Sequence, residues 1–388
     1  MATSKTIQMK TMVKSRIALM VRQVAGISIS WACIGALDAY FIHASSNNDY
    51  LQRTEIYDFS RFFWGNTVTG FLGGILAGSL LVFYMRERFR SYPFGLALLL
   101  NSIIISAFSF AFSALAFDVF FSQHMHRSLN DPLVLEKTAT ILRGPYYFKT
   151  VVLWSIVTFL TVVSLQVHEK YGPGILRKML LGRYHQPREE ERIFMFVDIK
   201  SSTTIAERLG HVRFFNLLND FFRDITNPIL YTSGEVYQYV GDEVVLSWTM
   251  EKGLQKANCI RCFFSMQEAI NRKAHRYKGR YGVVPEFKAG LHCGSVTTGE
   301  IGVIKKDIVF SGDVMNTTSR IQSMCNEYGV KILFSKYLMD KLSLPPNGYQ
   351  PRRMGMIELR GKRQKVELYT LNQSSISATP PPTITTMS

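Results

Sequence analysis

Long apolar stretches dominate the first half of the chain, whereas the second half alternates short apolar and polar segments. Four stretches before residue 170 are long enough to cross a lipid bilayer, because a helical span needs about 20 mostly apolar residues. We therefore expect four transmembrane helices, at Ile17–Ala44, Trp64–Tyr84, Phe94–Phe117 and Tyr147–Val167. The first follows a basic segment but is too long for a cleavable signal peptide, so it is predicted to remain as an anchor.

Basic residues beside these stretches predict how the chain is oriented. They precede the first stretch, follow the second and follow the fourth: Lys5, Lys10, Lys14, Arg16; Arg86, Arg88, Arg90; and Lys170, Arg177, Lys178, Arg183. Loops rich in Lys and Arg stay in the cytoplasm. We expect a multi-pass protein of the inner (plasma) membrane with both termini in the cytoplasm.

The net charge of +16 on 388 residues raises the question of an anionic partner. Much of the excess lies beside the apolar stretches, and the sequence has no helix-turn-helix, zinc-finger or RNP pattern. The lipid bilayer, with its anionic headgroups, is therefore the expected partner, and nucleic acid is not.

From residue 192 onward the pattern predicts an α/β domain. Short runs rich in Phe, Val and Ile are typical of buried strands, and longer segments with 3.6-residue periodicity are typical of helices. The expected strands are Arg192–Val197, Glu235–Val240, Glu243–Trp248 and Phe287–His292, and the expected helices are Thr204–Phe222 and Lys252–His275. This order predicts a ferredoxin-like βαββαβ core.

Two aspartates follow or join these strands. Asp198 comes directly after the strand Arg192–Val197, where α/β sheets commonly bind ligands. Asp242 lies in the two-residue turn Gly241-Asp242 between the two hairpin strands. Each alone is as compatible with a helix cap or turn as with a ligand, but two converging carboxylates suit Mg²⁺ and a polyphosphate.

A third element favours a functional role for the two aspartates over a purely structural one. Asn316 and Arg320 are four residues apart in a probable helix, so their side chains share one face. An amide beside a guanidinium suits the charge of a phosphoryl transition state.

Four ordered motifs resemble the catalytic domain of class III nucleotide cyclases, the adenylyl and guanylyl cyclase family, over about residues 192–371. The motifs are Phe196-Val-Asp198-Ile-Lys-Ser-Ser, Gly234-Glu-Val-Tyr-Gln-Tyr-Val-Gly-Asp242, Phe287-Lys288-Ala-Gly-Leu-His292-Cys-Gly294 and Gly312-Asp-Val-Met-Asn316-Thr-Thr-Ser-Arg320. The resemblance implies a membrane-bound adenylate cyclase that converts ATP to cyclic AMP and pyrophosphate.

The resemblance also implies roles for single residues. Asp198 and Asp242, helped by the Ile199 carbonyl, would hold two Mg²⁺ or Mn²⁺ ions. Asn316 would orient the ribose, and Arg320 would meet the charge that develops on the α-phosphate.

Further expectations concern the terminal phosphates and assembly. Lys288 and Lys362 are candidates for the terminal phosphates, although either is equally compatible with a solvated surface charge. Relatives of this kind work as dimers in which the metal aspartates come from one chain and the Asn/Arg pair from the other. Because this chain carries both halves once, we expect a homodimer with two equivalent sites.

The base-reading positions depart from the family pattern. Gln238 stands where adenylyl cyclases usually have Lys, and Val309 stands where Asp, Thr or Cys is usual. Gln can both donate and accept hydrogen bonds, so it suits adenine or guanine, whereas Val309 offers only apolar contact. ATP is favoured over GTP because neither position carries an acid for the guanine amino group.

Two other classes of protein share part of this pattern. A diguanylate cyclase shares the core but would place a Gly-Gly-Asp/Glu-Glu-Phe turn at the hairpin, where this chain has Val240-Gly-Asp242-Glu-Val244. A non-catalytic nucleotide-binding receptor with a degenerate cyclase domain is supported by Gln238 and Val309.

The predicted domains follow from these elements. They are a basic tail (1–16), a four-helix transmembrane domain (17–167), a cytoplasmic linker or transducer (168–191), the catalytic domain (192–371) and a disordered tail (372–388). An amphipathic basic segment at Ile175–Leu181 could transmit movement of the spans or dock on lipid.

Overall fold

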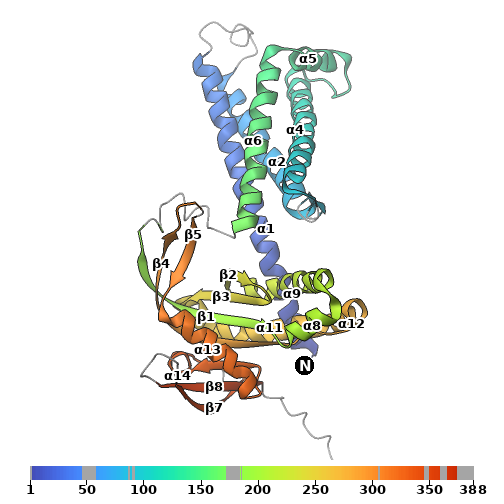
Figure 1. Ribbon diagram of the computed structural model, residues 1–388. Helices are drawn as coiled ribbons and strands as arrows, with labels where there is room; N and C mark the ends of the chain where they lie inside the picture. Colours follow the sequence, from blue (N-terminus) through green and yellow to red (C-terminus); the bar gives the residue numbers. More distant parts are fainter. Residues whose placement is uncertain are drawn as a thin grey trace, which may run out of the picture. The chain divides into compact units, whose positions relative to one another are not determined.

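The chain divides into two compact units, Ile17–Arg177 and a second unit formed by Met1–Arg16 with Lys178–Ser388 (Figure 1). The computed structural model describes residues 2–45, 58–85, 88–89, 92–171, 184, 186–304, 306–344, 349–358 and 365–373. The predicted segment Ile175–Leu181 lies outside these residues, as does most of the predicted tail; the last strand continues through Gln373, two residues past the predicted end of the catalytic domain.

The first unit contains four long helices. The helices are α1 (Ala2–Ser45), which belongs to this unit from Ile17 onward, α2 (Phe59–Ser79), continued by the π-helix η1 (Leu80–Met85), α4 (Phe94–Met125), the short α5 (Pro132–Leu142) and α6 (Pro145–Tyr171). Four segments are long and apolar enough to cross a membrane: Ile17–Ala44, Phe59–Met85, Phe94–Met125 and Tyr147–Val167. The second begins five residues before the predicted Trp64, because Asp58 caps the helix by accepting the Ser60 N–H at 2.8 Å.

Small and hydroxyl side chains mediate the contacts between these helices. Gly74 of α2 lies so close to α1 that a Cβ there would stand 2.6 Å from the Ser28 Cα. The Trp31 indole N–H donates to the Thr161 hydroxyl of α6 at 3.0 Å. Helices in lipid associate through such close approaches and interhelical hydrogen bonds.

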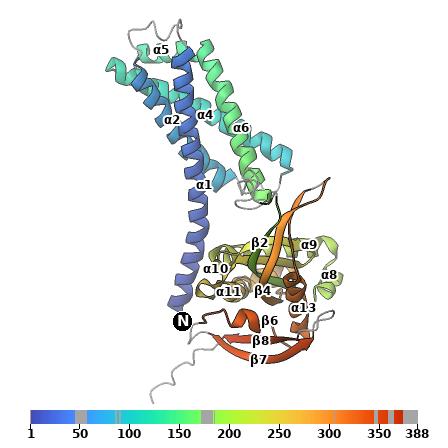
Figure 2. The same ribbon diagram turned by 90° about the vertical axis from the view of Figure 1, so that its left-hand side faces the viewer.

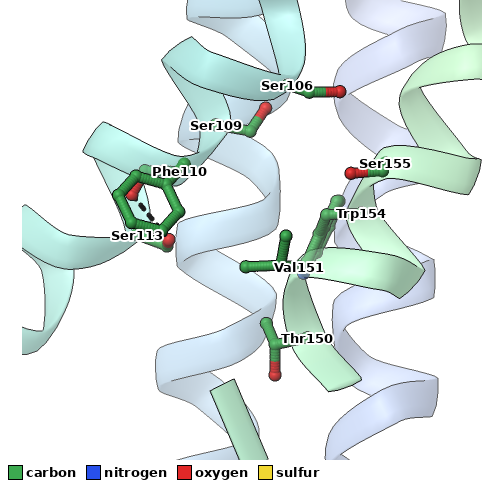
Figure 3. Close-up of a pocket in the computed structure, with 8 residues that line it drawn as sticks. All are labelled: Ser106, Ser109, Phe110, Ser113, Thr150, Val151, Trp154 and Ser155. Atoms are coloured by element: carbon green, nitrogen blue, oxygen red, sulfur yellow. Dashed lines mark hydrogen bonds between the residues drawn. The ribbon is translucent and has the colours of Figure 1, made fainter. Parts of the chain in front are cut away.

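A small recess lined by hydroxyl groups lies between α4 and α6 (Figure 3). Ser106, Ser109 and Ser113 line it from α4, and Thr150 and Ser155 from α6. The Ser113 and Tyr147 hydroxyls are 2.9 Å apart and link the two helices.

The second unit is built on one mixed sheet in the order β2-β3-β1-β4-β6-β8-β7, with β5 paired to β4. The strands are β1 (Arg188–Ile199), β2 (Glu235–Val240), β3 (Glu243–Thr249), β4 (Phe287–Ile301), β5 (Asp307–Ser311), β6 (Ile332–Ser335), β7 (Tyr349–Glu358) and β8 (Lys365–Gln373). The first four have the order β2-β3-β1-β4, with β1 antiparallel to both neighbours. The predicted ferredoxin-like core is therefore confirmed, and β4 and β5 extend beyond it as a hairpin (Figures 1 and 2).

The two predicted long helices are each broken. Thr204–Phe222 is divided into α8 (Ser202–Leu209) and α9 (His211–Tyr231), because Gly210 adopts a φ of 75° that ends the first helix. Lys252–His275 is divided into α10 (Met250–Leu254), the 3₁₀ turn η2 (Gln255–Ala257), α11 (Asn258–Arg272) and α12 (Ala274–Tyr281). The break follows left-handed backbone at Lys256 and Ala257, although neither residue is a Gly.

Side chains of β1 alternate between two covered faces. One face, formed by Ile193, Met195, Val197 and Ile199, belongs to the main core together with residues of α9 and α11. Phe194 and Phe196 point the other way and pack in a cluster that includes Val314 of α13 (Asp313–Glu327). Asp198 follows the alternation of Phe194 and Phe196, so it lies on the α13 side of the sheet.

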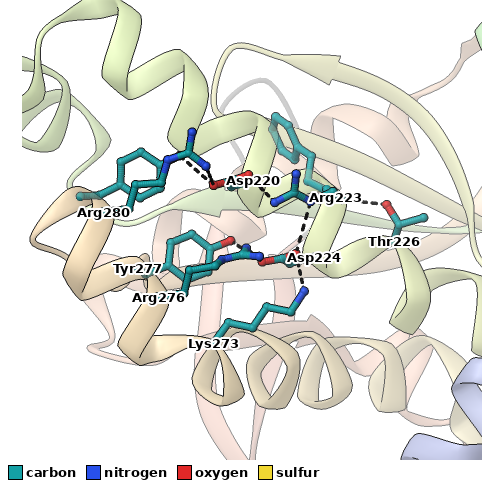
Figure 4. A network of polar contacts seen from close by, with 10 residues as sticks. Asp220, Arg223, Asp224, Thr226, Lys273, Arg276, Tyr277 and Arg280 are labelled. Carbon is teal, nitrogen blue, oxygen red and sulfur yellow. Dashed lines mark hydrogen bonds and ion pairs between the residues drawn. The ribbon is translucent and has the colours of Figure 1, made fainter. Parts of the chain in front are cut away.

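A polar network fastens α9 to the C-terminal end of α11 and to α12 (Figure 4). Asp224, whose side chain is fully buried, accepts from Lys273 at 2.6 Å and from the Tyr277 hydroxyl at 2.9 Å, and pairs with Arg276. Asp220 accepts from Arg280 at 3.0 Å. Because these buried carboxylates are paired and hydrogen-bonded, the network fixes the helical layer behind the sheet.

Helix α13 approaches the sheet closely at Gly290 of β4. A Cβ at Gly290 would lie 2.3 Å from the Gln322 backbone nitrogen and 2.6 Å from its Cα. Only a glycine leaves this space, so the crossing of α13 over β4 is fixed at this point.

We expect Gly290→Ala to destabilise the second unit, since the added methyl meets backbone that cannot rotate away. Overpacking of this kind should cost about 2 kcal/mol, which lowers the melting temperature by roughly 4–8 °C. Thermal unfolding of the full chain in detergent measures this change. Gly279→Ala is the matched control, because Gly279 of α12 has open space around it; an equal loss in both variants would contradict the proposed close packing.

Candidate active site

Asp198 and Asp242 meet at one end of the sheet. The antiparallel register of β1 and β3 pairs Asp198 with Glu243, and Asp242 immediately precedes Glu243 in the turn from β2. Gly241, with a φ of 63°, allows the tight turn. The hairpin thus carries the second aspartate to the first, as the sequence predicts for the two residues.

Negative charge accumulates at this point. Burial raises the pKa of Asp198, and the hydrogen bond and charge of the neighbouring Asp242 raise it further. Burial, followed by the charges of Asp198 and Asp242, raises the pKa of Glu243 to about 7. The carboxyl groups of Asp198 and Glu243 therefore resist ionisation.

One oxygen of the pair is unsatisfied. The Asp242 Oδ2 atom is buried and accepts no hydrogen bond. Because a buried polar atom without a partner is costly, the arrangement fits a cation between the carboxylates. No cluster of three His, Cys, Asp or Glu suited to a metal occurs among the described residues, so further ligands would be backbone carbonyls such as that of Ile199, water or phosphate oxygens.

Two other side chains hold Asp198, and both contact its Oδ2 atom. The Lys288 ammonium, 12% exposed on the neighbouring β4, lies 3.2 Å away. The Gln322 amide of α13 donates to the same oxygen at 3.0 Å. The carboxylate is thus oriented through one oxygen.

Gln322 was not predicted from the sequence. It lies two residues after Arg320, on a different face of the helix from Asn316 and Arg320, the two residues that the sequence motif singles out. No nearby sequence pattern links Gln322 to Asp198, 124 positions earlier. The signal that could have found it is Gly290, because a glycine in a central strand often marks a close backbone approach.

Asn316 and Arg320 lie on α13, as predicted, one helical turn apart. Asn316 is exposed and Arg320 is half-buried. The structure therefore brings the two aspartates together but leaves the Asn316 side chain on the surface of the same chain.

The remaining predicted residues are distributed as follows. Gln238 is exposed on β2, next to a β-bulge between Val236 and Gln238. Val309 is half-buried on β5, where it pairs with Gly299. Lys288, predicted to meet a phosphate, is paired with Asp198 here, and Lys362 lies outside the described residues.

Comparison with known proteins shows what this part of the chain is similar to. The sequence model of the adenylate and guanylate cyclase catalytic domain matches residues 184–373. Adenylate cyclase 2 of Rhizobium meliloti (strain 1021) is 37% identical over 216 residues, which cover 56% of this chain and 59% of that protein. An adenylate cyclase of Anabaena cylindrica is 25% identical over 182 residues, covering 45% of this chain and 35% of that protein.

Among solved structures, a bacterial light-regulated adenylyl cyclase is similar with a TM-score of 0.49 and 24% identity, over 57% of this chain and 65% of that one. The chain thus spans less than two thirds of the length of these relatives.

We expect Gln322→Leu to weaken divalent-metal binding about tenfold, in the range known for residues that orient a metal ligand. The leucine fills the space but cannot donate to Asp198. Titration with Mn²⁺, followed by the electron paramagnetic resonance signal of the free ion, measures affinity without catalysis. Ser323→Ala, on an exposed position of the same helix, should bind Mn²⁺ as the wild type does; unchanged affinity in Gln322→Leu would refute the role of this hydrogen bond.

Proposed function

We propose that this chain is a nucleotide cyclase, because residues 184–373 match the sequence model of adenylate and guanylate cyclase catalytic domains. It joins the ribose 3′-oxygen of a nucleoside triphosphate to its own α-phosphate and releases pyrophosphate. The observation that carries the proposal is the Asp198–Asp242 pair with its unsatisfied buried oxygen, placed by the β1–β3 register within the matched region.

The chain's carboxylates would hold the metal ions. Asp198 and Asp242, with the Ile199 carbonyl, are proposed to bind two Mg²⁺ or Mn²⁺ ions. When bound, such ions acidify the attacking hydroxyl and neutralise phosphate charge. Gln322 and Lys288 orient Asp198, and Asp242 receives a partner for its unsatisfied oxygen.

A second chain is proposed to complete each site. Asn316 would orient the ribose and Arg320 would meet the charge on the α-phosphate of a nucleotide held by the partner's aspartates. Support comes from the exposure of Asn316 on α13, where its side chain is open to a second chain. Lys288, once displaced from Asp198, and Lys362 are proposed to contact the terminal phosphates. The assembly is then a homodimer with two equivalent sites.

ATP is the proposed substrate. The relative with 37% identity is an adenylate cyclase, and neither Gln238 nor Val309 offers an acid to the guanine amino group. GTP or another nucleotide is the alternative, as is a receptor that binds nucleotide without turnover.

The first unit is proposed to anchor the enzyme in the inner (plasma) membrane. Four helices have the length and composition of spans, and the basic residues beside them favour a cytoplasmic catalytic domain. The proposed catalytic domain includes the whole of β1 and β8, residues 188–373, and the segment between α6 and β1 is the proposed linker between membrane and catalyst.

We expect the full-length chain in lipid nanodiscs, incubated with Mn²⁺ and ATP, to yield cyclic AMP detectable by mass spectrometry. Separate incubations with GTP, CTP and UTP define the substrate. Asp242→Asn, which keeps the shape but removes the charge, should lower the rate at least about 1,000-fold, and excess EDTA should abolish product. Nucleotide binding without any cyclic product would favour the receptor.

We expect a mixture of Asp198→Ala and Arg320→Ala chains to regain activity, since each heterodimer then holds one intact site. With random pairing, recovery should reach about one quarter of the wild-type rate, because half of the dimers carry one active site of two. Asp198→Ala mixed with Asp242→Ala is the control, as both changes affect the same half of the site. Equal activity in the two mixtures would rule out the shared site.

A further inference from the structure

The two positions proposed to read the base lie on strands that share no hydrogen-bond ladder. Gln238 belongs to β2, which pairs with β3, and Val309 belongs to β5, which pairs with β4. In the sheet order, β3 and β1 separate β2 from β4. The backbone thus connects Gln238 to Val309 only through four successive strand pairings, and direct contact between β2 and β5 is left to side chains.

The residues beside them, Tyr237 and Phe310, make that contact. Their ring centroids are 4.9 Å apart, at an interplanar angle of 58°. The Phe310 backbone N–H also donates to the Tyr237 hydroxyl at 3.3 Å. Phe194 of β1 packs edge-on against Phe310 at 5.4 Å. A β-bulge between Val236 and Gln238 accommodates Tyr237 on this face of the sheet.

A buried arginine holds this pair from behind. Arg192 of β1 is only 2% exposed, and its guanidinium lies 4.7 Å from the Phe310 ring centroid. The same guanidinium binds the Glu235 carboxylate of β2 at 2.7 Å and the Ser247 hydroxyl of β3 at 3.0 Å. Arg192 therefore contacts β2, β3 and β5 at once.

The arginine is also tied to β4. Arg192 pairs with Glu190 at 3.4 Å, and Glu190 accepts from Thr298 of β4 at 2.7 Å. A buried charge with planar, directional donors persists only where its partners are fixed, so the guanidinium acts as a rigid spacer between the strands. The catalytic aspartates take no part in this cluster.

We propose that Arg192, Tyr237 and Phe310 are positioning residues that set the separation of Gln238 and Val309 and thereby select the nucleotide base. The inference rests on the proposed function, because it assumes that a nucleoside triphosphate binds there. The three residues act through their neighbours and touch neither metal nor phosphate. Their loss alters recognition of the base more than the rate of ring closure.

The test uses full-length protein in nanodiscs with Phe310→Leu, Arg192→Met and Phe310→Tyr. Phe310→Leu keeps an apolar side chain but removes the ring, Arg192→Met removes the charge and keeps the length, and Phe310→Tyr retains an aromatic ring. Arg261→Met is the matched control: Arg261 of α11 lies over the Tyr231 ring at 5.2 Å and bonds its hydroxyl at 3.0 Å, away from the proposed base site.

Phe310→Leu and Arg192→Met should each raise KM for ATP about tenfold, while kcat stays within about threefold of the wild-type value. The ratio of kcat/KM for ATP to kcat/KM for GTP should fall about tenfold in both variants. Phe310→Tyr should retain the wild-type ratio, and Arg261→Met should change neither KM nor the ratio. Displacement of a fluorescent ATP analogue by ATP and by GTP measures the same selectivity without turnover.

The outcomes separate this inference from the proposed function. A wild type that selects between ATP and GTP in displacement but forms no cyclic product defeats the proposed function and leaves base selection measurable in the variants. A purine ratio unchanged within about twofold in Phe310→Leu, whether or not its melting temperature falls, overturns the positioning role. An equal loss of kcat for every nucleotide would also overturn the positioning role.

Discussion

The repulsion between Asp198 and Asp242 is the constraint on which the second unit depends. The β1–β3 register brings both carboxyl groups, with Glu243, to one end of the sheet, and burial raises the pKa of Asp198 there. A fold that served stability alone would separate these groups. Lys288 and Gln322 offset part of the cost, but both bind one oxygen of Asp198 and leave the Asp242 Oδ2 atom unsatisfied. The site is therefore poised for positive charge from outside the chain.

The repulsion also explains why α13 must lie so close to the sheet. Gln322 reaches Asp198 only because Gly290 lets the helix backbone approach β4. The same helix carries Asn316 on its exposed surface. In the proposed dimer, one helix thus orients the metal carboxylate of its own chain and supplies the ribose and phosphate contacts of the other. A shift of α13 would then act on both sites together.

The sequence predicted the parts of the molecule that depend on local patterns. Apolar length identified the four long helices, and short apolar runs identified the order of the βαββαβ core. The predicted helices ran through both breaks: Gly210 is a local signal that the apolar periodicity outweighed, whereas left-handed backbone at Ala257 has no such signal in the residue itself. The roles of Gln322 and Arg192 were not predicted for a related reason. Their partners are distant in sequence, and neither residue belongs to a motif.

Arg192 shows how far such long-range contacts reach. As the first residue of the predicted strand Arg192–Val197, it would be expected at a solvated end, yet it lies inside β1, buried and bound to β2 and β3, with its guanidinium over Phe310 of β5. Replacing such a residue with an apolar side chain is often neutral or stabilising, so stability alone does not account for it. An apolar side chain, however, has no directional donors and could not hold its neighbours in a fixed orientation. Because β2 and β5 share no ladder, a planar charged group with fixed partners holds them at a defined separation, while the carboxylates at the far end of β1 remain free to bind charge.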